Sequence, residues 1–408
     1  MNALMSITIV GQGYVGLPIA VNAAKAGHRV FGFDIDSTKI KHLKAGITDS
    51  PDISTSQLLK LQSNGQLSFI DKLSKSEKSH IYVIAVPTPT TDDLKPDHSY
   101  LEKACDLVSE VVSPNSLIIN ESTSHIGTLR NFIKPRIDSK SSHHDLLYAV
   151  APERIDPGNF IWNIKNTPRL LSGLTQSGAK KAFEFYSSFC DNIVLVSEPE
   201  VAEAAKLLEN TFRHINIALI NELSNIFERF GVSTFEVVNA AKTKPFGFMP
   251  FFPSIGVGGH CIPVDPNYLQ YSAEHFGLKS HFIDRANEVN LNRIEEIIKK
   301  IEKYIGSKIR GKKIQLVGLS YKQDISDIRE SPALNLLSRL RESGATVTWH
   351  DPLVNSWGDE ISAPIQANID LGIILTPHQA VDYTVWKNNN ILVVDLSPAT
   401  DIGWKKLL

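Results

Sequence analysis

The sequence predicts an α/β protein in which a central helical domain joins two doubly wound, parallel-sheet domains. Three observations lead to this prediction. Short β-rich runs alternate with helical stretches over residues 7–196, a helical segment over Glu198–Phe230 has no glycine or proline after Pro199, and a second α/β pattern begins at Lys312. Strands separated by helices are typical of parallel sheets with helices on both faces.

The first α/β region is expected to span residues 1–197. Its strands are short runs of branched apolar and aromatic residues, each followed by a turn or a helical stretch. We predict strands at Ile7–Val10, Arg29–Phe33, Ile81–Val86, Leu117–Asn120 and Leu147–Val150.

The remaining chain is expected to divide into a helical part, residues 198–308, and a smaller α/β part, residues 309–408. In the helical part we predict helices over Glu198–Phe230, Ser233–Ala241 and about Ser280–Ile305, with a loop rich in proline, glycine and phenylalanine over Lys244–Pro266. In the last part we predict strands at Ile314–Leu319, Thr346–His350, Leu371–Leu375 and Ile391–Asp395.

The composition is that of an ordinary globular chain, with 408 residues of which 42% are hydrophobic and 21% charged. A formal net charge of -2 gives no reason to expect a nucleic acid or an anionic membrane as partner. Three cysteines, an odd number, favour a reducing, cytoplasmic setting over a disulfide framework. No apolar run approaches the ~18 residues of a membrane span, and the N-terminus lacks the pattern of a signal peptide.

The motif Gly11-Gln-Gly-Tyr-Val-Gly16 follows the first strand and opens a helix. In this position Gly11 permits a tight turn, Gly13 lets the backbone approach a pyrophosphate, and Gly16 allows the helix to pack closely on the strand. Tyr14 and Val15 lie at the helix N-terminus, where N–H groups and the helix dipole favour an anion. The first domain is therefore predicted to be a Rossmann-like dinucleotide-binding domain.

Polar residues at the strand ends extend this prediction. Asp34 ends the second strand, where an acid accepts hydrogen bonds from a ribose 2′-OH and repels a 2′-phosphate, so NAD is favoured over NADP. Ligands bind outside the carboxyl ends of the strands in such sheets. We therefore expect Thr88 and Thr123 to face the cofactor, and Glu153 and Arg154 to lie deeper, toward a substrate. The alternative is that the threonines and the glutamate only cap the following helices.

The long helix after residue 197 carries a polar stripe within an apolar surround. Lys206, Asn210 and Arg213 are spaced i, i+4 and i+7, so they share one helix face. Such a stripe is either a solvated face or the lining of an anion-binding site. The spacing by itself leaves both readings open.

The segment Gly256-Val-Gly-Gly-His-Cys-Ile-Pro-Val-Asp265 places a cysteine directly after a glycine-rich bend. Glycines such as Gly258 let the backbone approach a ligand closely, and a thiolate at Cys261 would attack an aldehyde if nearby donors lower its pKa. The alternative is that Cys261 is a small buried residue. Cys105 and Cys190 lie in apolar, helical contexts and are expected to be structural. No second pair of ligands with suitable spacing supports a metal site.

Over essentially its whole length, the chain resembles the UDP-glucose/GDP-mannose dehydrogenase family. The resemblance rests on seven segments in one order: Gly11–Gly16, Asp34, Ala151-Pro-Glu-Arg154, Lys206-x-x-x-Asn210, Gly-Gly-His-Cys261-Ile-Pro-x-Asp265, Gly318-Leu-Ser-Tyr321-Lys322 and Arg329-Glu-Ser-Pro332. It favours the functional interpretation of both the Lys206 stripe and the cysteine.

The resemblance implies a four-electron oxidation of a UDP-sugar C6 alcohol to a carboxylate with two NAD+. Cys261 would be the nucleophile that carries a thioester, Lys206 a base and oxyanion stabiliser, and Asn210 a donor to the same oxygen. Asp265 would help to activate water or the thiol, Glu153 would act as the acid in thioester hydrolysis, and Thr123 would contribute to the same site. Tyr321 and Lys322 would contact the sugar nucleotide, together with Arg154, Arg213 and Gly258. Arg329 would bind the NAD pyrophosphate.

Two departures from the UDP-glucose pattern point to a branch that acts on UDP-N-acetylhexosamines. Pro157 stands where that pattern has a second glutamate, and His260 stands where it has a serine. The segment Ala241–Phe248 resembles that of the members acting on UDP-N-acetylglucosamine, and this resemblance implies that sugar rather than the N-acetylmannosamine isomer. A product of this kind would be a precursor of a bacterial-type surface polysaccharide.

Other functions remain open at this point. UDP-N-acetylmannosamine or UDP-glucose could be the substrate of the same chemistry. A two-electron hydroxyacid dehydrogenase would share the NAD domain but would need neither the cysteine nor the second α/β domain, and a non-catalytic NAD-binding regulator would not need the set Cys261, Lys206, Asn210 and Asp265. The resemblance also implies a homodimer or higher homo-oligomer through the central helix.

Overall fold

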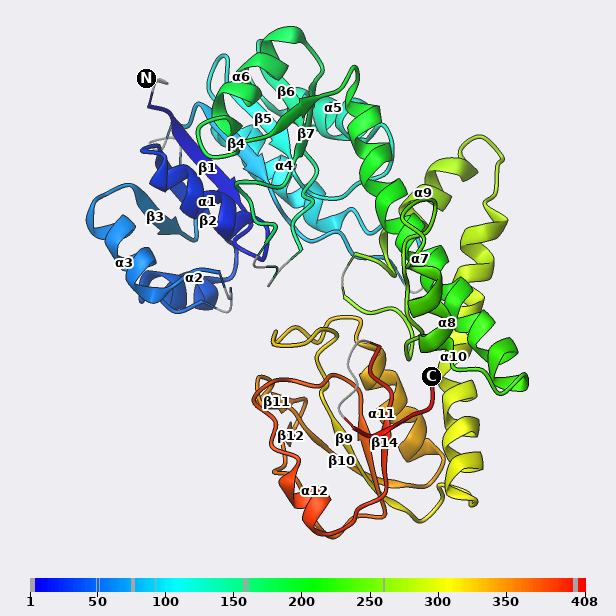
Figure 1. Cartoon of the computed structure of the whole chain (residues 1–408). Coiled ribbons are helices and arrows are strands. Elements are labelled where there is room, and N and C mark those ends of the chain that lie inside the picture. Colours follow the sequence, from blue (N-terminus) through cyan, green and yellow to red (C-terminus); the bar gives the residue numbers. More distant parts are fainter. Residues whose placement is uncertain are drawn as a thin grey trace. The chain divides into compact units, whose positions relative to one another are not determined.

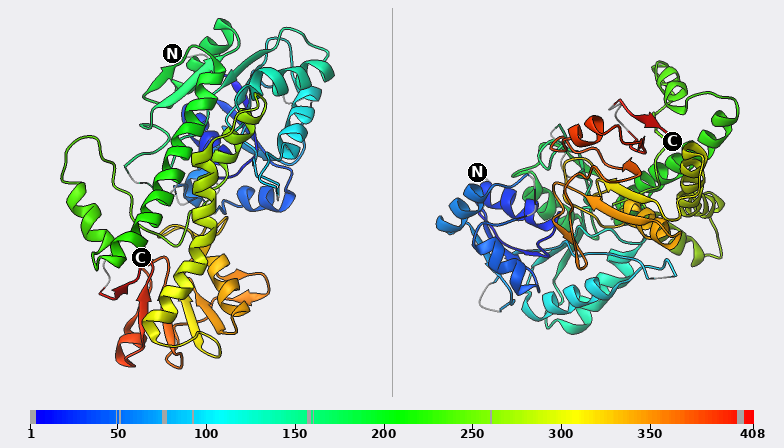
Figure 2. Two further views of the ribbon diagram at one scale, coloured as in Figure 1. Left: turned by 90° about the vertical axis from the view of Figure 1, so that its right-hand side faces the viewer. Right: turned by 90° about the horizontal axis from the view of Figure 1, so that it is seen from below.

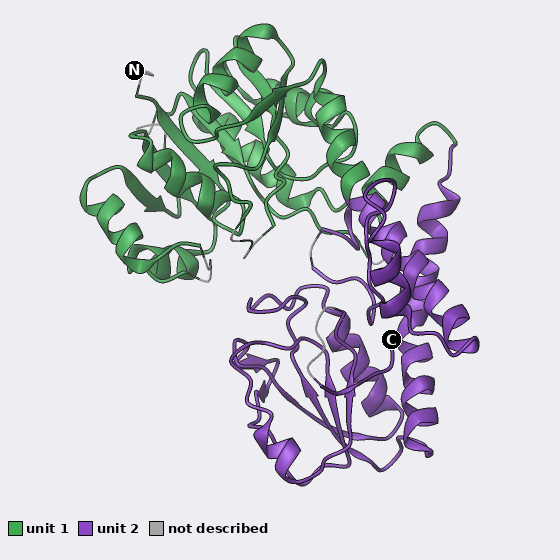
Figure 3. Cartoon of the chain, in the orientation of Figure 1, with its two compact units in different colours: residues 1–209, 267–277 green, residues 210–266, 278–408 purple. Residues whose placement is uncertain are grey.

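A computed structural model describes residues 4–48, 50, 52–74, 78–91, 93–156, 159, 161–259, 261–398 and 403–408. The chain forms two compact units, Met1–Glu209 with Asn267–Gly277 and Asn210–Pro266 with Leu278–Leu408 (Figure 3). The short segment 267–277 thus belongs to the first unit although it lies far along the chain. No helix among the described residues combines the length and the apolar character needed to cross a membrane.

The first unit contains an eight-stranded sheet with the order β3-β2-β1-β4-β5-β6-β7-β8 (Figure 1). The predicted strands are present as β1 (Ser6–Val10), β2 (Arg29–Phe33), β4 (Ile81–Ile84), β5 (Leu117–Asn120) and β6 (Leu147–Val150). The sheet places β1 between β2 and β4, which is the switch point where ligands bind in doubly wound folds.

Three strands of this sheet were not predicted: β3 (Leu67–Ile70), β7 (Arg169–Gly173) and β8 (Ile193–Leu195). β7 pairs antiparallel with β6, so the sheet is mixed at this end rather than parallel throughout. Its register pairs Ala149 with Gly173 and Val150 with Ser172. An antiparallel strand begins at the edge where the neighbouring parallel strand ends, and this brings Arg169 to the edge that carries the strand-end loops.

Helices cover this sheet: α1 (Gly16–Lys25), α2 (Ser37–Lys44), α3 (Thr55–Ser63), α4 (Ser99–Val111), the π-helical turn η1 (Leu129–Ile133) with α5 (Lys134–Lys140), and α6 (Gln176–Tyr186). Their buried faces form two apolar clusters with the strands. Ser54 caps α3 in a capping box with Gln57, and Thr175 caps α6. The apolar residues of the central strands therefore meet helices on both faces of the sheet.

The predicted central helices are present as α7 (Pro199–Arg229), α8 (Thr234–Ala241) and α10 (His281–Ile305), while α9 (Asp265–Glu274) begins inside the predicted loop. α7 and α10 lie side by side in the second unit (Figure 2), where His214 Nε2 is 2.9 Å from Asn287 Oδ1. The fully buried Arg293 on α10 donates to the carbonyl of Asn221 on α7. This helix pair supports the loop that leads to Cys261.

The C-terminal sheet has the order β10-β9-β13-β14-β15, and all of its pairs are parallel. The predicted strands are present as β9 (Lys313–Val317), β10 (Thr346–His350), β13 (Leu371–Ile374) and β14 (Val393–Asp395), and β15 (Lys405–Lys406) adds an edge. A short hairpin, β11 (Ser356–Trp357) and β12 (Glu360–Ile361), follows β10, and the remaining helices are α11 (Pro332–Glu342) and α12 (Thr384–Asn388). One face of α10 packs with α11 and the sheet in a single apolar cluster.

Candidate active site

The glycine motif forms the turn between β1 and α1, and each glycine has a separate reason to be there. Gly11 has a φ of +96°, and a Cβ on it would lie 2.4 Å from the carbonyl oxygen of Ala85. A Cβ on Gly16 would lie 1.8 Å from the carbonyl oxygen of Gly11. A Cβ on Gly13 would meet nothing within 4 Å, so Gly13 borders open space.

That open space has the properties that a dinucleotide pyrophosphate needs. Val15, at the N-cap of α1, makes no side-chain capping hydrogen bond. The Leu17 N–H donates to the Gly13 carbonyl at 3.2 Å and Pro18 has no N–H, so an anion would be bound by the N–H groups around Gly16. The half-buried side chain of Tyr14 lies in the same turn. The turn therefore fits NAD in the way that the glycine spacing predicts.

Asp34 follows β2 and is almost fully buried. Its Oδ2 accepts from the Gln12 N–H at 3.0 Å and from Lys39 Nζ at 3.0 Å, and its Oδ1 accepts from the Asp36 N–H at 3.0 Å. The carboxylate is thus fixed beside the glycine turn, where a ribose hydroxyl can donate to it. A 2′-phosphate at this position would meet the same negative charge.

The loops after β4 and β5 are joined to each other. Ser122 Oγ accepts from the Val86 N–H at 2.9 Å and donates to the Val86 carbonyl at 2.9 Å. Thr88 is buried and Thr123 is half-buried on these two loops. Both threonines therefore come from neighbouring strand ends, as the sequence predicted, and neither side chain serves as the N-cap acceptor of α4 or η1.

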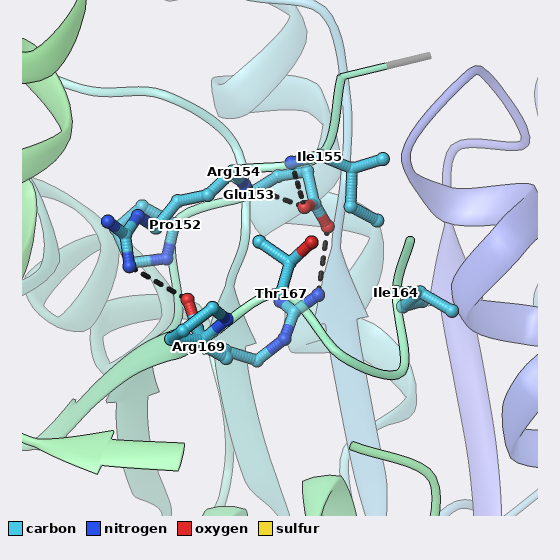
Figure 4. A pocket seen from close by; sticks show the side chains of 8 residues that line it. Pro152, Glu153, Arg154, Ile155, Ile164, Thr167 and Arg169 are labelled. Atoms are coloured by element: carbon cyan, nitrogen blue, oxygen red, sulfur yellow. Dashed lines mark hydrogen bonds and ion pairs between the residues drawn. The ribbon is translucent and has the colours of Figure 1, made fainter. Parts of the chain in front are cut away.

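Glu153 follows β6 and lies in a buried ionic cluster (Figure 4). Arg169 NH2 donates to Glu153 Oε2 at 2.9 Å, and the Arg154 and Ile155 N–H groups donate to Glu153 Oε1 at 2.6 and 2.7 Å. Arg169 NH1 donates to both oxygens of Glu121 at 2.6 Å. Sequence reasoning missed Arg169 and Glu121, since the motif after β5 drew attention only to Thr123 and nothing local marks Arg169.

The surroundings shift the pKa values of the two carboxyls in this cluster in opposite directions. Burial raises the pKa of Glu121 to about 7, although the charge of Arg169 opposes the shift. Burial acts on Glu153 in the same direction, but the charge and hydrogen bond of Arg169, together with two backbone N–H groups, outweigh it and lower the pKa of Glu153. Glu153 is therefore ionised at neutral pH.

A cavity of about 10 Å³ adjoins Glu153 and Arg169, and it has the size of a single water molecule. The side chains around it are those of Pro152, Glu153, Arg154, Ile155, Ile164, Thr167, Pro168 and Arg169 (Figure 4). Thr167 Oγ1 is buried and has no hydrogen-bond partner among the described residues. A small polar molecule beside the Glu153 carboxylate would find a donor or acceptor there.

Arg154, predicted to face the substrate, is tied to the start of the central helix. Its Nε and NH2 donate to Glu209 at 3.1 and 2.6 Å, and its NH1 donates to the Pro168 carbonyl at 2.7 Å. Glu209 is another residue that sequence reasoning missed. The pair links the loop after β6 to α7 close to Lys206, three residues earlier on the helix.

The three side chains of the polar stripe on α7 differ in how deeply they are buried. Lys206 and Asn210 are buried, with 9% and 6% of their surface exposed, whereas Arg213 is exposed. The Lys206 ammonium has no hydrogen-bond or ion-pair partner within the described part of the chain. A buried cation without a carboxylate beside it is suited to stabilise an oxyanion. Asn210 has a partner, and that partner lies in the cysteine loop.

The cysteine loop is held by its last residue. Asn210 Nδ2 donates to Asp265 Oδ2 at 2.5 Å, and the Asp265 N–H donates to the Cys261 carbonyl at 2.9 Å. Asp265 is 1% exposed and starts α9, while Cys261 is exposed. The sequence placed Cys261, Asp265 and Asn210 in one site, and the structure brings these three together within the second unit.

The other two cysteines are buried as predicted. Burial raises the pKa of the Cys105 thiol to about 12 and that of the Cys190 thiol to about 11. Cys105 lies in α4, whereas Cys190 lies after α6 rather than in the predicted helical context. Both thiols are poor nucleophiles at neutral pH because little thiolate forms.

The bend before Cys261 packs on the segment after β9. A Cβ on Gly258 would lie 2.8 Å from Tyr321 Cβ, and a Cβ on Gly259, whose φ is +83°, would lie 2.9 Å from Tyr321 Cε2. The Gly259 N–H donates to the Arg329 carbonyl at 3.2 Å. The contacts explain why glycines are needed there, and they bring two predicted substrate residues, Gly258 and Tyr321, side by side.

Other predicted residues of this segment are placed as follows. The Arg329 guanidinium is exposed and donates from Nε and NH2 to Asp327, at 2.9 and 2.6 Å. Lys322 is half-buried in the same segment. Pro157 and His260, the two departures from the UDP-glucose pattern, lie outside the described residues.

Arg293 is a further residue that the sequence did not mark. It donates from Nε to the Ser254 carbonyl at 3.0 Å, and the Ser254 N–H donates to Asn221 Oδ1 at 2.8 Å. The start of the cysteine loop is thereby fixed to both long helices. In the sequence Arg293 is one of several charged residues on α10, so it gave no signal for such a role.

Comparison with known families supports the same assignment in all three parts of the chain. Three models of the UDP-glucose/GDP-mannose dehydrogenase family match: the NAD binding domain over residues 5–190, the central domain over 200–292 and the UDP binding domain over 315–401. The resemblance inferred from the motifs is therefore confirmed.

Individual relatives agree with these matches. A UDP-N-acetyl-D-mannosamine dehydrogenase of Pyrococcus horikoshii is 33% identical over 94% of this chain and 92% of its own. A UDP-N-acetyl-D-glucosamine 6-dehydrogenase of Pseudomonas aeruginosa is 33% identical over 86% of this chain and 84% of its own. A solved structure of a UDP-D-ManNAc dehydrogenase from Pyrococcus horikoshii covers 98% of both chains with a TM-score of 0.87 and 30% identity.

Proposed function

The chain belongs to the UDP-glucose/GDP-mannose dehydrogenase family and is an NAD-dependent oxidoreductase, and on this premise we propose that it oxidises the C6 alcohol of a UDP-N-acetylhexosamine to a carboxylate through a thioester on Cys261. The observation that carries the proposal is the contact between Asn210 and Asp265, because it joins the cysteine loop to the helix face that bears Lys206. NAD+ supplies the hydride acceptor when bound, and one NAD+ would be consumed in each of the two oxidations.

The proposed steps balance in atoms and charge. The alcohol loses a proton and a hydride to give an aldehyde, and the Cys261 thiolate adds to the aldehyde carbon. The resulting thiohemiacetal oxyanion loses a second hydride to give the neutral thioester. Water then adds to the thioester, and the thiolate leaves as the carboxylic acid forms.

Each residue has a task in these steps. Lys206 takes the proton of the alcohol as its free amine, and the ammonium formed in this way stabilises the oxyanion that develops when the thiolate adds. Asn210 donates to the same oxygen while its contact with Asp265 orients the loop, and Asp265 assists the thiol and the water. Each preorganised donor of this kind lowers the activation free energy by about 3 kcal/mol.

Glu153 serves the hydrolysis step in this scheme. Because the pKa of Glu153 is lowered, its ionised form can accept a proton from the attacking water and return it to the departing thiolate. Thr123, on the loop after β5, orients this water or the cofactor. Thr88 and Asp34 hold the dinucleotide at the neighbouring strand ends.

The UDP part of the substrate is assigned to the C-terminal domain. The family model for UDP binding covers residues 315–401, which include Tyr321, Lys322 and Arg329. We assign Lys322 to the sugar nucleotide and Arg329 to the NAD pyrophosphate, because a guanidinium can bind two phosphate oxygens at once. Arg154 and Arg213 would add positive charge around the diphosphate.

For the sugar, we favour UDP-N-acetylglucosamine because of the segment Ala241–Phe248, and UDP-N-acetylmannosamine is the second candidate. Relatives named for either sugar are about equally similar, at 33% identity. The product would serve as a precursor of a bacterial-type surface polysaccharide, in the cytoplasm.

NADH production against a panel of UDP-sugars, with NADH counted per acid formed, tests this proposal. We expect two NADH per acid with a UDP-N-acetylhexosamine and much slower turnover of UDP-glucose. Cys261→Ser should release aldehyde-level or trapped product but little acid. One NADH per turnover, or normal acid formation by Cys261→Ser, would contradict the thioester route.

We also propose that the chain forms a homodimer through α7. Leu208, Phe212, Leu219 and Ile226 are 63%, 44%, 51% and 48% exposed. They fall on one stripe, since each residue turns the helix by about 100°. The stripe lies opposite Lys206 and Asn210, so a second copy could cover it without blocking them. Exposed apolar stripes of this length are typical of protein interfaces.

A further inference from the structure

The buried pair of Glu121 and Arg169 has no task in the scheme above, although Arg169 contacts Glu153 directly. We infer that Arg169 is a positioning residue: clamped by Glu121 and Tyr186, it orients the Glu153 carboxylate and holds it in its ionised form for hydrolysis of the thioester. The inference rests on the proposed function, because it assumes that Glu153 acts on the water.

The topology of the sheet explains how Arg169 reaches this position. β7 pairs antiparallel with β6 in a register that joins Ala149 to Gly173 and Val150 to Ser172. Continuing this register by three residues places Arg169 opposite Glu153. A parallel strand would have begun at the other edge of the sheet. The antiparallel direction of β7 therefore places Arg169 at the edge of the sheet where β5 and β6 end.

The clamp leaves Arg169 little freedom. NH1 bonds both oxygens of Glu121 at 2.6 Å and NH2 bonds Glu153 at 2.9 Å. The guanidinium carbon lies 4.7 Å from the ring centre of Tyr186, whose hydroxyl donates to Glu121. Arg169 and Glu121 are 4% and 1% exposed. A side chain held on three sides in this way can fix the Glu153 carboxylate within a narrow range of orientations.

The charges of the cluster determine what each substitution should do. One guanidinium faces the carboxylates of Glu121 and Glu153, while Tyr186 and Cys190 are the other titratable groups against it. The Arg154 guanidinium donates to Glu209, so it does not take the place of Arg169 beside the Glu153 carboxylate. Removing the Arg169 charge takes away the cation that lowers the pKa of the buried Glu153 carboxyl, so that pKa should rise. The pKa of Glu121 is already about 7 beside Arg169, so Glu121 should be protonated in the same variant, and its replacement by glutamine should change the pKa of Glu153 little further.

The experiment measures acid release from the enzyme-bound thioester in single turnovers as a function of pH, in the full chain. Arg169→Met should slow release at pH 7 at least about tenfold and move the acid limb of the profile up by about one pH unit or more. In Arg169→Met with Glu121→Gln, the limb should stay near that of Arg169→Met, because Glu121 carries no charge there at neutral pH. Arg169→Lys, which keeps the charge but lacks the fork, should slow release with little movement of the limb.

A structural role alone would lower the rate at every pH without moving the acid limb, so a loss of rate with the limb in place overturns the inference. If Arg169→Met does not fold, the charge-balanced double variant carries the test, and a pH profile identical to the wild type overturns the inference. Arg136→Met is the matched control, because Arg136 also bonds a carboxylate bidentately, that of Asp106, outside this cluster. Its profile should equal that of the wild type.

Glu153→Gln separates this inference from the proposed function. If Glu153→Gln releases acid at the wild-type rate, the proposed role of Glu153 fails, and the inference fails with it. If Glu153→Gln is slow but Arg169→Met leaves the acid limb in place, only the role of Arg169 fails.

Discussion

The amide of Asn210 donates a hydrogen bond of 2.5 Å to the carboxylate of Asp265, across 55 residues of sequence. Both side chains are buried, with 6% and 1% of their surface exposed. Because the Asp265 N–H also bonds the Cys261 carbonyl, this contact transmits the position of α7 to the cysteine. The proposed nucleophile, Cys261, is exposed, yet its backbone is fixed by a buried pair.

We expect Asn210→Ala to lower kcat by about 10²-fold, since it removes one donor and leaves the Asp265 carboxylate buried without its amide partner. Asn216→Ala is the control, because Asn216 is on the same helix and bonds only the Phe212 carbonyl. Steady-state kinetics would decide the matter. Equal kcat values for the two variants would show that the contact does not serve the reaction.

Two substitutions in the glycine turn should affect different properties, one the stability of the fold and the other the binding of NAD. Gly11→Ala should destabilise the chain, because the residue has a φ of +96° and its new Cβ would lie 2.4 Å from the Ala85 carbonyl. Gly13→Ala should leave the melting temperature nearly unchanged, because its Cβ meets nothing within 4 Å, but should weaken NAD binding at least about tenfold. Thermal unfolding and calorimetric titration with NAD measure the two effects. Unchanged NAD affinity in Gly13→Ala would remove this turn from the cofactor site.

Asp34→Ala should weaken NAD binding and relax the discrimination against NADP. The substitution removes a ribose partner and also the negative charge beside Lys39, whose ammonium could then attract a 2′-phosphate. Asp36→Ala is the matched control, because the Asp36 carboxylate only caps α2. Michaelis constants for both dinucleotides would be compared, and kinetics unchanged with both would exclude Asp34 from the site.

Thiol alkylation should distinguish Cys261 from the other cysteines. At pH 8 the raised pKa values of Cys105 and Cys190, about 12 and 11, leave these buried thiols almost fully protonated. Cys261 is exposed, so iodoacetamide should label it first and acid formation should stop as labelling proceeds. Intact mass and peptide mapping would follow the reaction. Full activity after stoichiometric labelling of Cys261 would contradict its role as nucleophile.

The apolar stripe of α7 predicts the effect of charge on assembly. Phe212→Asp combined with Leu219→Asp should turn a dimer into a monomer, because two carboxylates per copy would be buried at the interface. Multi-angle light scattering at micromolar concentration measures the mass. A wild-type chain that is monomeric at that concentration would count against the dimer.

The sequence predicted the elements of this chain where local interactions decide them. The glycine turn is one example, since the φ of Gly11 and the crowding at Gly16 are requirements of a strand–turn–helix unit. The spacing of Lys206 and Asn210 is another, because four residues make about one turn of helix. The NAD domain, the long helix and the cysteine loop therefore followed from short-range patterns together with the resemblance.

The tertiary structure alone decided which distant groups meet. Arg169 lies 48 residues from Glu121 and 16 from Glu153, and the three come together only because β7 runs antiparallel to β6. Strand direction and register depend on pairing across the sheet, which leaves no periodic mark within either strand. For the same reason the sequence could place Glu153 at a strand end but could not show that its charge is held by a buried arginine.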